Sequence, residues 1–209
     1  MNERRIFSHD CVAEGVDWLV RQDPRWQGAV AHAGPLPLRL NPEGFAELQR
    51  IIMGQQVSVA SADAVQRKLE AAGMDDPDTV LSASDAALRG LGLSRQKVRY
   101  VKALAAADID YAGLRRMPAD MVVARLTAVP GIGRWTADIY LMFSLGRADA
   151  FAPGDLALQE AARMIFDLPA RPDEKALRGM SMDWSPWRSV AARIMWAYYM
   201  QEKQREGIR

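Results

Sequence analysis

The sequence predicts an all-α protein. Hydrophobic residues recur at helical spacing around Phe45–Ile52, Val98–Leu104 and Val190–Tyr198. No segment alternates hydrophobic and polar residues with the period of two that a half-buried strand requires. Glycine and proline interrupt the chain often, so we expect mostly short helices, roughly 8 to 16 residues long, joined by brief turns.

The positions of these interruptions give the order of the expected helices. Breaks fall at residues 34–42, 75–77, 118, 130–133, 153–154 and 169–172. Each segment between two breaks is long enough for one or two helices. No repeat of solenoid period and no low-complexity segment is present.

Composition limits the class of protein. The 209 residues are 49% hydrophobic, enough for one globular unit or two small lobes. No apolar run approaches the roughly 18 residues of a membrane span, so we expect a soluble cytoplasmic protein. Cys11 is the single cysteine, which excludes an internal disulfide, a four-cysteine zinc site and an iron-sulfur cluster. His9 and His32 are the two histidines, and with so few Cys and His ligands we expect no transition metal.

The net charge of +1 does not by itself indicate a nucleic-acid partner. One stretch nevertheless contains basic residues and no acidic ones: Arg89, Arg95, Lys97, Arg99 and Lys102. A solvated helix face and a phosphate-binding patch explain this stretch equally well.

The most specific motif is the string Val-Pro-Gly-Ile-Gly-Arg-Trp-Thr-Ala within Leu126–Asp138. Gly131 and Gly133 allow a tight hairpin between two helices, and Ile132 between them can anchor the hairpin in the core. The amides from Gly131 to Arg134 then lie at a helix N-terminus, where they favour an anion such as a DNA phosphate. The alternative is an ordinary loop between two helices.

This string resembles the hairpin of the helix-hairpin-helix/GPD superfamily of DNA glycosylases, and a second motif supports the resemblance. The string Phe-Ala-Pro-Gly-Asp-Leu-Ala follows the hairpin's second helix, and the resemblance identifies its aspartate, Asp155, as the catalytic carboxylate. Asp155 is also suited to be the N-cap of a helix that begins near Leu156, and both roles are compatible.

One carboxylate suffices for the chemistry that the resemblance implies. Cleavage of an N-glycosidic bond builds positive charge on the deoxyribose, which a fixed anion stabilises. A base such as 3-methyladenine or 7-methylguanine is already cationic and leaves without a general acid, and the sequence offers no evident His or Glu for that role.

Tryptophans indicate which branch of the superfamily the chain resembles. Residues 185–196 are similar to the C-terminal Pro-Trp-Arg-Ser helix of bacterial 3-methyladenine DNA glycosylase II, which implies that Trp196 lines the base pocket. Trp135 matches a second pocket tryptophan and replaces the Schiff-base lysine of the lyase branches, so we expect hydrolysis without a lyase step. Ile139 and Gly154 replace a pocket tyrosine and a second acidic residue of that relative. The alternative for Trp196 is a helix buried on all sides.

A third segment, residues 51–60, resembles the Gly-Gln-x-Val-Ser element that inserts a wedge into the DNA stack. It implies that Gln56 is the wedge, and that Gln55 and Ser58 contact DNA with the hairpin residues Gly131, Ile132, Gly133, Arg134 and Thr136. The alternative for the two glutamines is a polar helix end.

The resemblance covers most of the chain and predicts two helical lobes with a DNA-facing cleft. Residues 45–147 form the central lobe, with the helix-hairpin-helix at about 120–145, while residues 1–44 pack with the helices of residues 148–209. The resemblance also implies a Na⁺ or K⁺ ion at the carbonyls of Thr127, Val129 and Gly131. We expect no other cofactor and no iron-sulfur cluster.

We therefore expect a monomeric hydrolase of base excision repair that flips alkylated bases out of double-stranded DNA and is associated with the nucleoid. Three alternatives remain: a glycosylase for deaminated or oxidised bases, a non-catalytic hairpin protein that binds DNA, and a helical protein that binds other proteins.

Overall fold

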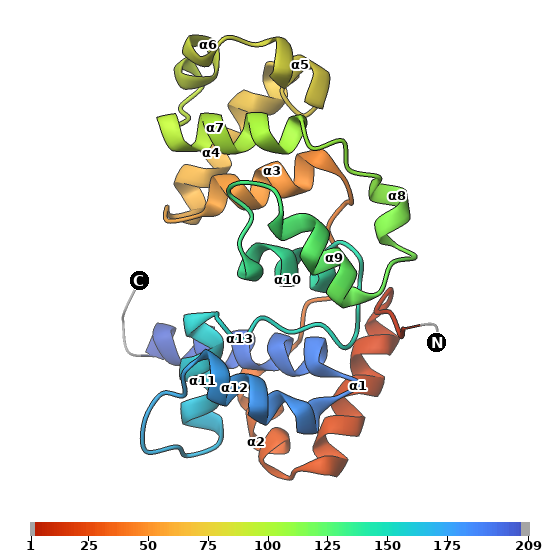
Figure 1. The fold of residues 1–209 in the computed structure, drawn as a ribbon. Coiled ribbons are helices and arrows are strands. Elements are labelled where there is room, and N and C mark those ends of the chain that lie inside the picture. The colour runs from red at the N-terminus through yellow and green to blue at the C-terminus, as the bar shows by residue number, and fades with distance from the viewer. Residues whose placement is uncertain (1–2, 206–209) are drawn as a thin grey trace. The chain divides into compact units, whose positions relative to one another are not determined.

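A computed structural model describes residues 3–205, without the side chains of residues 59 and 205. Residues 1–2 and 206–209, which end two of the predicted ranges, lie outside this description. The described residues form helices and no strands (Figure 1), so the all-α prediction is confirmed. The helices are α1 His9–Gln22, α2 Arg25–Ala33, α3 Phe45–Gly54, α4 Val59–Ala71, α5 Pro77–Ser82, α6 Asp85–Gly90, α7 Arg95–Ala105, α8 Tyr111–Leu114, α9 Ala119–Thr127, α10 Arg134–Phe143, α11 Leu156–Ile165, α12 Glu174–Met180, the 3-10 helix η1 Ser181–Trp184, and α13 Arg188–Arg205.

Short polar side chains start most of these helices. A serine or aspartate at the N-cap accepts a hydrogen bond from a backbone N–H of the first turn, which satisfies a donor that has no partner within the helix. These residues are Ser8, Ser58, Asp76, Ser84, Ser94, Asp110, Asp155 and Asp173. The local sequence thus fixes where the helices begin.

Two compact units make up the chain. The first comprises Met1–Leu40 and Leu141–Arg209, and the second comprises Asn41–Tyr140, so that one division falls within α10. We describe each unit separately. None of the helices in residues 3–205 has both the length and the apolar character needed to cross a membrane.

In the first unit, α13 is the central helix and packs against α1, α2 and α11. The α1 contact is close because an added Cβ on Gly15 would come within 2.6 Å of Val190 Cγ2. An aromatic cluster fills the rest of this core. Phe166 and Trp184 stack with ring centroids 5.6 Å apart, and Trp26 meets both edge-on. Burial of these large rings is the main stabilising contribution to the unit.

In the second unit, α3 packs against α4 and α7, and α7 also covers α5 and α6. Tyr140 joins the end of α10 to the start of α3, because its hydroxyl accepts a hydrogen bond from the Gly44 N–H at 2.9 Å. Burial raises the pKa of Tyr140 to about 12, so this hydroxyl stays neutral. The contact links α10, which follows the hairpin, to α3, which precedes the predicted DNA-binding residues Gln55 and Gln56.

Candidate functional site

The hairpin between α9 and α10 has the tight geometry that its sequence predicts. Gly131 has a φ of +93°, and an added Cβ there would lie 2.6 Å from Tyr100 Cβ, so only glycine fits. Ile132 is 4% exposed and donates its N–H to the Val129 carbonyl. The prediction that Ile132 anchors the hairpin in the core is confirmed. Gly133 leads directly into α10, which places the hairpin at a helix N-terminus.

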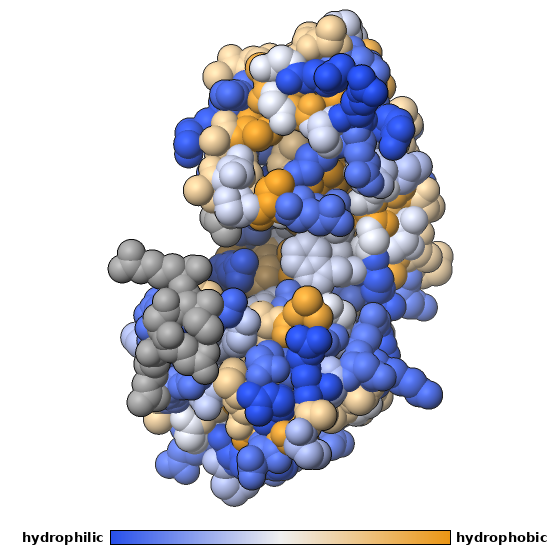
Figure 2. All heavy atoms as spheres, turned by 90° about the vertical axis from the view of Figure 1, so that its left-hand side faces the viewer, coloured by the Kyte–Doolittle hydropathy of each residue, from blue (hydrophilic) through white to orange (hydrophobic). Residues whose placement is uncertain are grey.

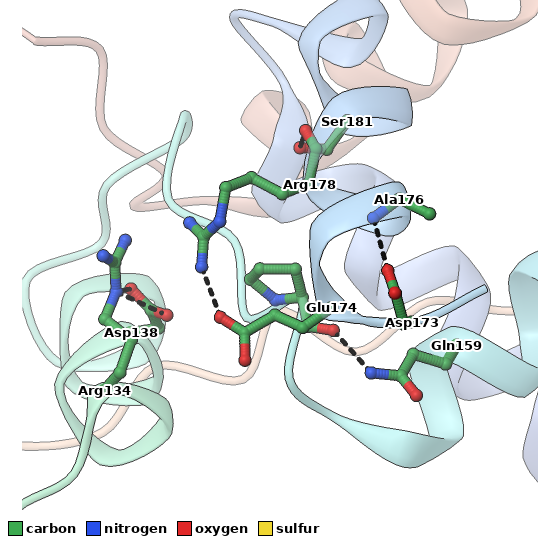
Figure 3. Close-up of polar contacts among 9 residues, drawn as sticks. Arg134, Asp138, Gln159, Asp173, Glu174, Ala176, Arg178 and Ser181 are labelled. Carbon is green, nitrogen blue, oxygen red and sulfur yellow. Dashed lines mark hydrogen bonds and ion pairs between the residues drawn. The ribbon is translucent and has the colours of Figure 1, made fainter.

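The first turns of α10 hold residues of different exposure. Arg134 is half-exposed and pairs with the buried Asp138 one turn later, at 2.9 Å (Figure 3). Trp135 is 39% exposed, whereas Thr136 is 1% exposed and Ile139 is buried. Of these predicted site residues, Arg134 and Trp135 can meet a ligand from solvent, while Thr136 faces inward.

The turn between α3 and α4, residues 55–58, is here called the wedge turn. The Gln55 amide donates to the Gly131 carbonyl and to Thr136 Oγ1, both at 3.1 Å, so this predicted DNA contact is engaged with the hairpin. Gln56 is exposed and has a φ of +59°, a left-handed conformation uncommon outside glycine. Ser58 caps α4 by accepting the Ser61 N–H. Gln56 and Val57, the other two residues of this turn, are exposed.

A cavity of about 930 Å³ lies in the same unit, lined by the wedge turn, the start of α7 and the hairpin. Lys97 and Trp135 both contribute to its wall. Over α3, α4 and α7, Figure 2 shows polar side chains mixed with isolated hydrophobic ones rather than a continuous apolar area. Such a surface suits a polar partner better than an apolar protein face.

The basic stretch of the sequence divides into side chains with different surroundings. Arg95 and Arg99 are exposed on α7, and Lys102 pairs with Asp85. Lys97 is half-buried, and its ammonium donates to the Met53 carbonyl at 2.6 Å. Burial lowers the pKa of Lys97. The stretch is therefore neither a wholly solvated face nor a uniform patch.

In the first unit, Asp155 is the N-cap of α11, as predicted. Its Oδ1 accepts the N–H of Ala157 at 2.9 Å and that of Leu158 at 3.1 Å, and it also accepts the indole N–H of Trp196 at 3.2 Å. The preceding loop is fixed because the buried Gln159 amide donates to the Pro153 carbonyl at 2.9 Å (Figure 3). The carboxylate is thus held in one orientation by backbone and aromatic donors.

Trp196 is half-buried on α13 and belongs to a group of aromatic and basic side chains. Its ring lies beside Phe143, with centroids 5.6 Å apart. The exposed Arg39 guanidinium lies 4.5 Å from the Phe143 ring centroid and 5.5 Å from that of Trp196. A cation therefore already contacts these rings, which shows that they can support a cation–π interaction.

Buried Arg193 supports this group from inside the unit. Its guanidinium donates to the Leu38 carbonyl at 3.1 Å and lies 4.9 Å from the Phe143 ring centroid. Burial, with a smaller contribution from Arg39, lowers the pKa of Arg193 to about 10. Because Leu38 is held in this way, the next residue, Arg39, with a φ of +48°, is directed toward the rings.

The structure brings the predicted residues together in two sets. Asp155 and Trp196 share a hydrogen bond in the first unit, while Gln55, Thr136 and the hairpin form one bonded group in the second. Trp135 and Ile139 belong to the second unit, and their role in a base pocket stays a prediction. Arg39 and Phe143 were not predicted from the sequence, because no local pattern links either residue to Trp196.

The monovalent cation that the resemblance implies would need hairpin carbonyls that can still accept a ligand bond. The Val129 carbonyl accepts the Ile132 N–H, and the Gly131 carbonyl accepts the Gln55 amide. A carbonyl oxygen has two lone pairs, so the Val129 and Gly131 carbonyls can each still accept a cation, and their donor chemistry fits the ion. The Na⁺ or K⁺ site stays a prediction.

No group of three or more His, Cys, Asp or Glu side chains in residues 3–205 is placed so that it could hold a metal ion.

Comparison with known proteins places this geometry in a family. The sequence model of one protein family, the HhH-GPD superfamily base excision DNA repair proteins, matches residues 50–186. A DNA-3-methyladenine glycosidase from Bacillus halodurans has 30% identity and a TM-score of 0.77, covering 95% of this chain and 93% of its own. Schizosaccharomyces pombe 3-methyladenine DNA glycosylase, solved with abasic DNA, has 27% identity and a TM-score of 0.77, covering 88% and 95%.

A search of curated protein sequences also finds a 3-methyladenine glycosylase among the similar proteins. DNA-3-methyladenine glycosylase 1 of S. pombe is 28% identical over 188 residues, which cover 83% of this chain and 82% of the relative. The family match contains the wedge turn, the hairpin and Asp155. The chain belongs to the HhH-GPD superfamily of base excision DNA repair proteins.

Proposed function

We propose that this protein is a monofunctional DNA glycosylase that flips alkylated bases out of duplex DNA and removes them by hydrolysis. The observation that carries the proposal is the hydrogen bond between the Trp196 indole and Asp155 Oδ1. It joins the carboxylate that acts on the sugar to the aromatic ring that stacks on the flipped base. A protein that only binds DNA phosphates has no need of this arrangement.

The reaction breaks the bond between C1′ of the deoxyribose and a nitrogen of the base. The base leaves with the bonding electrons, and positive charge develops on the sugar. The fixed Asp155 carboxylate stabilises that charge without having to reorient. Water then adds to C1′ and loses a proton, which leaves an abasic site. A base that is already cationic needs no protonation before it leaves.

Trp196 and Phe143 suit a positively charged base. An electron-rich ring attracts a cation by roughly 0.5–2 kcal/mol, depending on desolvation. Arg39 beside these rings is a protein cation in a comparable position. The aromatic group therefore supports alkylated purines such as 3-methyladenine and 7-methylguanine as substrates, as do the names of the relatives.

Binding of duplex DNA is proposed to use the second unit. The hairpin amides at the start of α10 bind a backbone phosphate, and exposed Gln56 enters the space that the flipped base leaves. The S. pombe structure with abasic DNA supports DNA as the partner.

We further propose that the protein acts as a monomer. Light scattering tests this by measuring the molar mass in solution, which should equal the mass of one chain.

Absence of a lyase step follows from Trp135. An indole cannot form the Schiff base with C1′ that a lysine amine forms in bifunctional glycosylases. The expected product is an intact strand with an abasic site, which is cut only after treatment with hot alkali. Strand cleavage by the protein alone, or a covalent adduct trapped by borohydride, contradicts this part of the proposal.

Base release from four defined lesions tests the substrate class. Duplexes with 3-methyladenine, 7-methylguanine, hypoxanthine or uracil are incubated with excess protein, and the free bases are measured. We expect release of the two methylated purines at rates above those of the other two bases. Release of hypoxanthine or uracil alone makes the protein a glycosylase for deaminated bases. Binding without any release favours a non-catalytic DNA-binding protein.

A further inference from the structure

The end of α3 and the first residue of the wedge turn are both held by residues that are distant in sequence. Lys97 Nζ of α7 donates to the Met53 carbonyl at 2.6 Å. The Gln55 amide donates to the Gly131 carbonyl and to Thr136 Oγ1. All of these atoms belong to the second unit.

The Lys97 bond satisfies a helix end. Met53 lies in the last turn of α3, where carbonyls have no partner within the helix and the helix dipole favours a cation. The ammonium is half-buried, and this desolvation lowers the pKa of Lys97. The Lys97 side chain therefore binds the end of α3, directly before the wedge turn.

The Gln55 bonds attach the same turn to the hairpin. Thr136 is 1% exposed, and Gly131 is locked by its positive φ and its contact with Tyr100. Gln55 thus bonds to two rigid groups of the hairpin rather than to a mobile surface. A displacement of the hairpin must displace the wedge turn with it.

Directly after these two attachments comes Gln56, which is exposed. Its φ of +59° costs a non-glycine residue on the order of 1 kcal/mol, and such strain persists only where the surroundings hold it. Gln56 is exposed, so packing of its own side chain does not explain the conformation. The neighbouring attachments of Met53 and Gln55 do.

We propose that Lys97 and Gln55 are positioning residues that hold Gln56 in register with the hairpin, so that phosphate binding and wedge insertion occur together. The inference rests on the proposed function, because it assigns Gln56 the wedge role. It also revises the expected DNA contacts of Gln55 and Thr136, and it gives Lys97 a role outside the two alternatives left open for the basic stretch. Gln55 and Thr136 act through the hairpin rather than by touching DNA, and Lys97 serves the wedge turn rather than a phosphate.

Substitution of Lys97 by methionine tests this inference. Lys97→Met keeps an unbranched side chain of similar size and removes the donor, while Lys97→Arg restores a cationic donor. Lys68→Met is the matched control, because Lys68 is an exposed lysine in the last turn of α4, at the end away from the wedge turn. Melting temperatures establish that all variants are folded.

Wedge insertion is measured without any base excision. The probe is a duplex with an abasic site and 2-aminopurine opposite it, whose fluorescence changes when its stacking is disturbed. We expect Lys97→Met to bind an undamaged duplex with unchanged affinity and salt slope but to lose most of the fluorescence change on the abasic duplex. Lys97→Arg should recover the change, and Lys68→Met should behave as wild type. On methylated DNA, the single-turnover rate of Lys97→Met should fall roughly 10- to 100-fold.

Three results overturn the inference. A salt slope reduced by about 1 with weaker binding identifies Lys97 as a phosphate contact. An unchanged fluorescence response means that Lys97 does not position the wedge turn. In a Gln56→Ala background, Lys97→Met should have little further effect, so full additivity shows that Lys97 does not act through Gln56. Because the abasic probe needs no excision, these results stay separate from a failure of the proposed activity.

Discussion

At the scale of single residues, Asp155 is the N-cap of α11, and we propose that the same carboxylate has a chemical role. Its Oδ1 receives two backbone N–H groups of α11 and the indole N–H of Trp196. The cap fixes the orientation of the carboxylate, and that fixed orientation is what stabilisation of a sugar cation requires. If the proposed role is correct, folding of this loop also orients the catalytic carboxylate.

Substitution of Trp196 by phenylalanine should separate stacking from the hydrogen bond to Asp155. Trp196→Phe keeps an aromatic ring beside Phe143 but removes the donor to Oδ1. A hydrogen bond to a charged group contributes about 1.5–3 kcal/mol, so we expect the single-turnover excision rate to fall roughly tenfold or more. Affinity for undamaged DNA should not change. Equal loss of rate and affinity contradicts the assigned role and makes Trp196 a core residue.

At the scale of secondary-structure elements, the hairpin shows what a short sequence can predict. The turn, the buried Ile132 and the cap at Asp155 depend on neighbours within a few residues, so their sequence signals are local. The left-handed conformation of Gln56 had no such signal, because the residue at that position is not glycine. The bonds of Lys97 to Met53 and of Gln55 to Gly131 join distant segments, and no single segment predicts them.

The group around Trp196 shows the same limit. Trp196 was predicted either to line a pocket or to be buried in the core, and helical periodicity alone could not decide. The structure gives a half-buried ring that bonds to Asp155 and contacts Arg39. Arg39 comes from a proline-interrupted segment whose sequence gave no functional indication. Its place depends on Arg193 and Leu38, which meet only in the folded unit.

The two hairpin glycines provide a matched pair of variants. Gly131→Ala introduces a Cβ at a φ of +93° and against Tyr100, whereas an added Cβ on Gly133 meets nothing within 4 Å. A left-handed non-glycine residue costs about 1–2 kcal/mol, and the contact with Tyr100 adds to that cost. We expect Gly131→Ala to lower both the melting temperature and the affinity for all DNA, damaged or not. Gly133→Ala should change the melting temperature much less.

Equal behaviour of the two alanine variants in melting and in binding contradicts this account of the hairpin. A loss of affinity for damaged DNA alone would also contradict it, because a phosphate contact does not distinguish one base from another.

At the scale of the whole molecule, charge is distributed rather than concentrated. A net charge of +1 gives little long-range attraction to DNA, so affinity has to come from local groups. Several basic residues are already paired within the protein, among them Arg134 with Asp138 and Lys102 with Asp85. The exposed Arg95 and Arg99 of α7 and the hairpin amides are candidates for phosphate contacts in the second unit.

The salt dependence of DNA affinity tests this view of the whole molecule. Each phosphate contact releases counterions and contributes about −0.9 to the slope of log K against log salt. We expect a clear but shallow dependence, with the slope of a protein that makes only a few contacts, measured by fluorescence anisotropy on an undamaged duplex. An affinity that does not respond to salt contradicts phosphate binding by the hairpin.

The most direct test of the central claim is base release by Asp155→Asn. Asparagine is as good an N-cap as aspartate, and its side-chain oxygen can accept the same N–H groups, so the fold and DNA binding should be preserved. Only the negative charge beside the sugar is lost. On methylated duplex DNA under single-turnover conditions, we predict that wild type releases the base and that Asp155→Asn binds equally well but releases almost none. Release by the variant at the wild-type rate would contradict the assignment of Asp155 as the catalytic carboxylate.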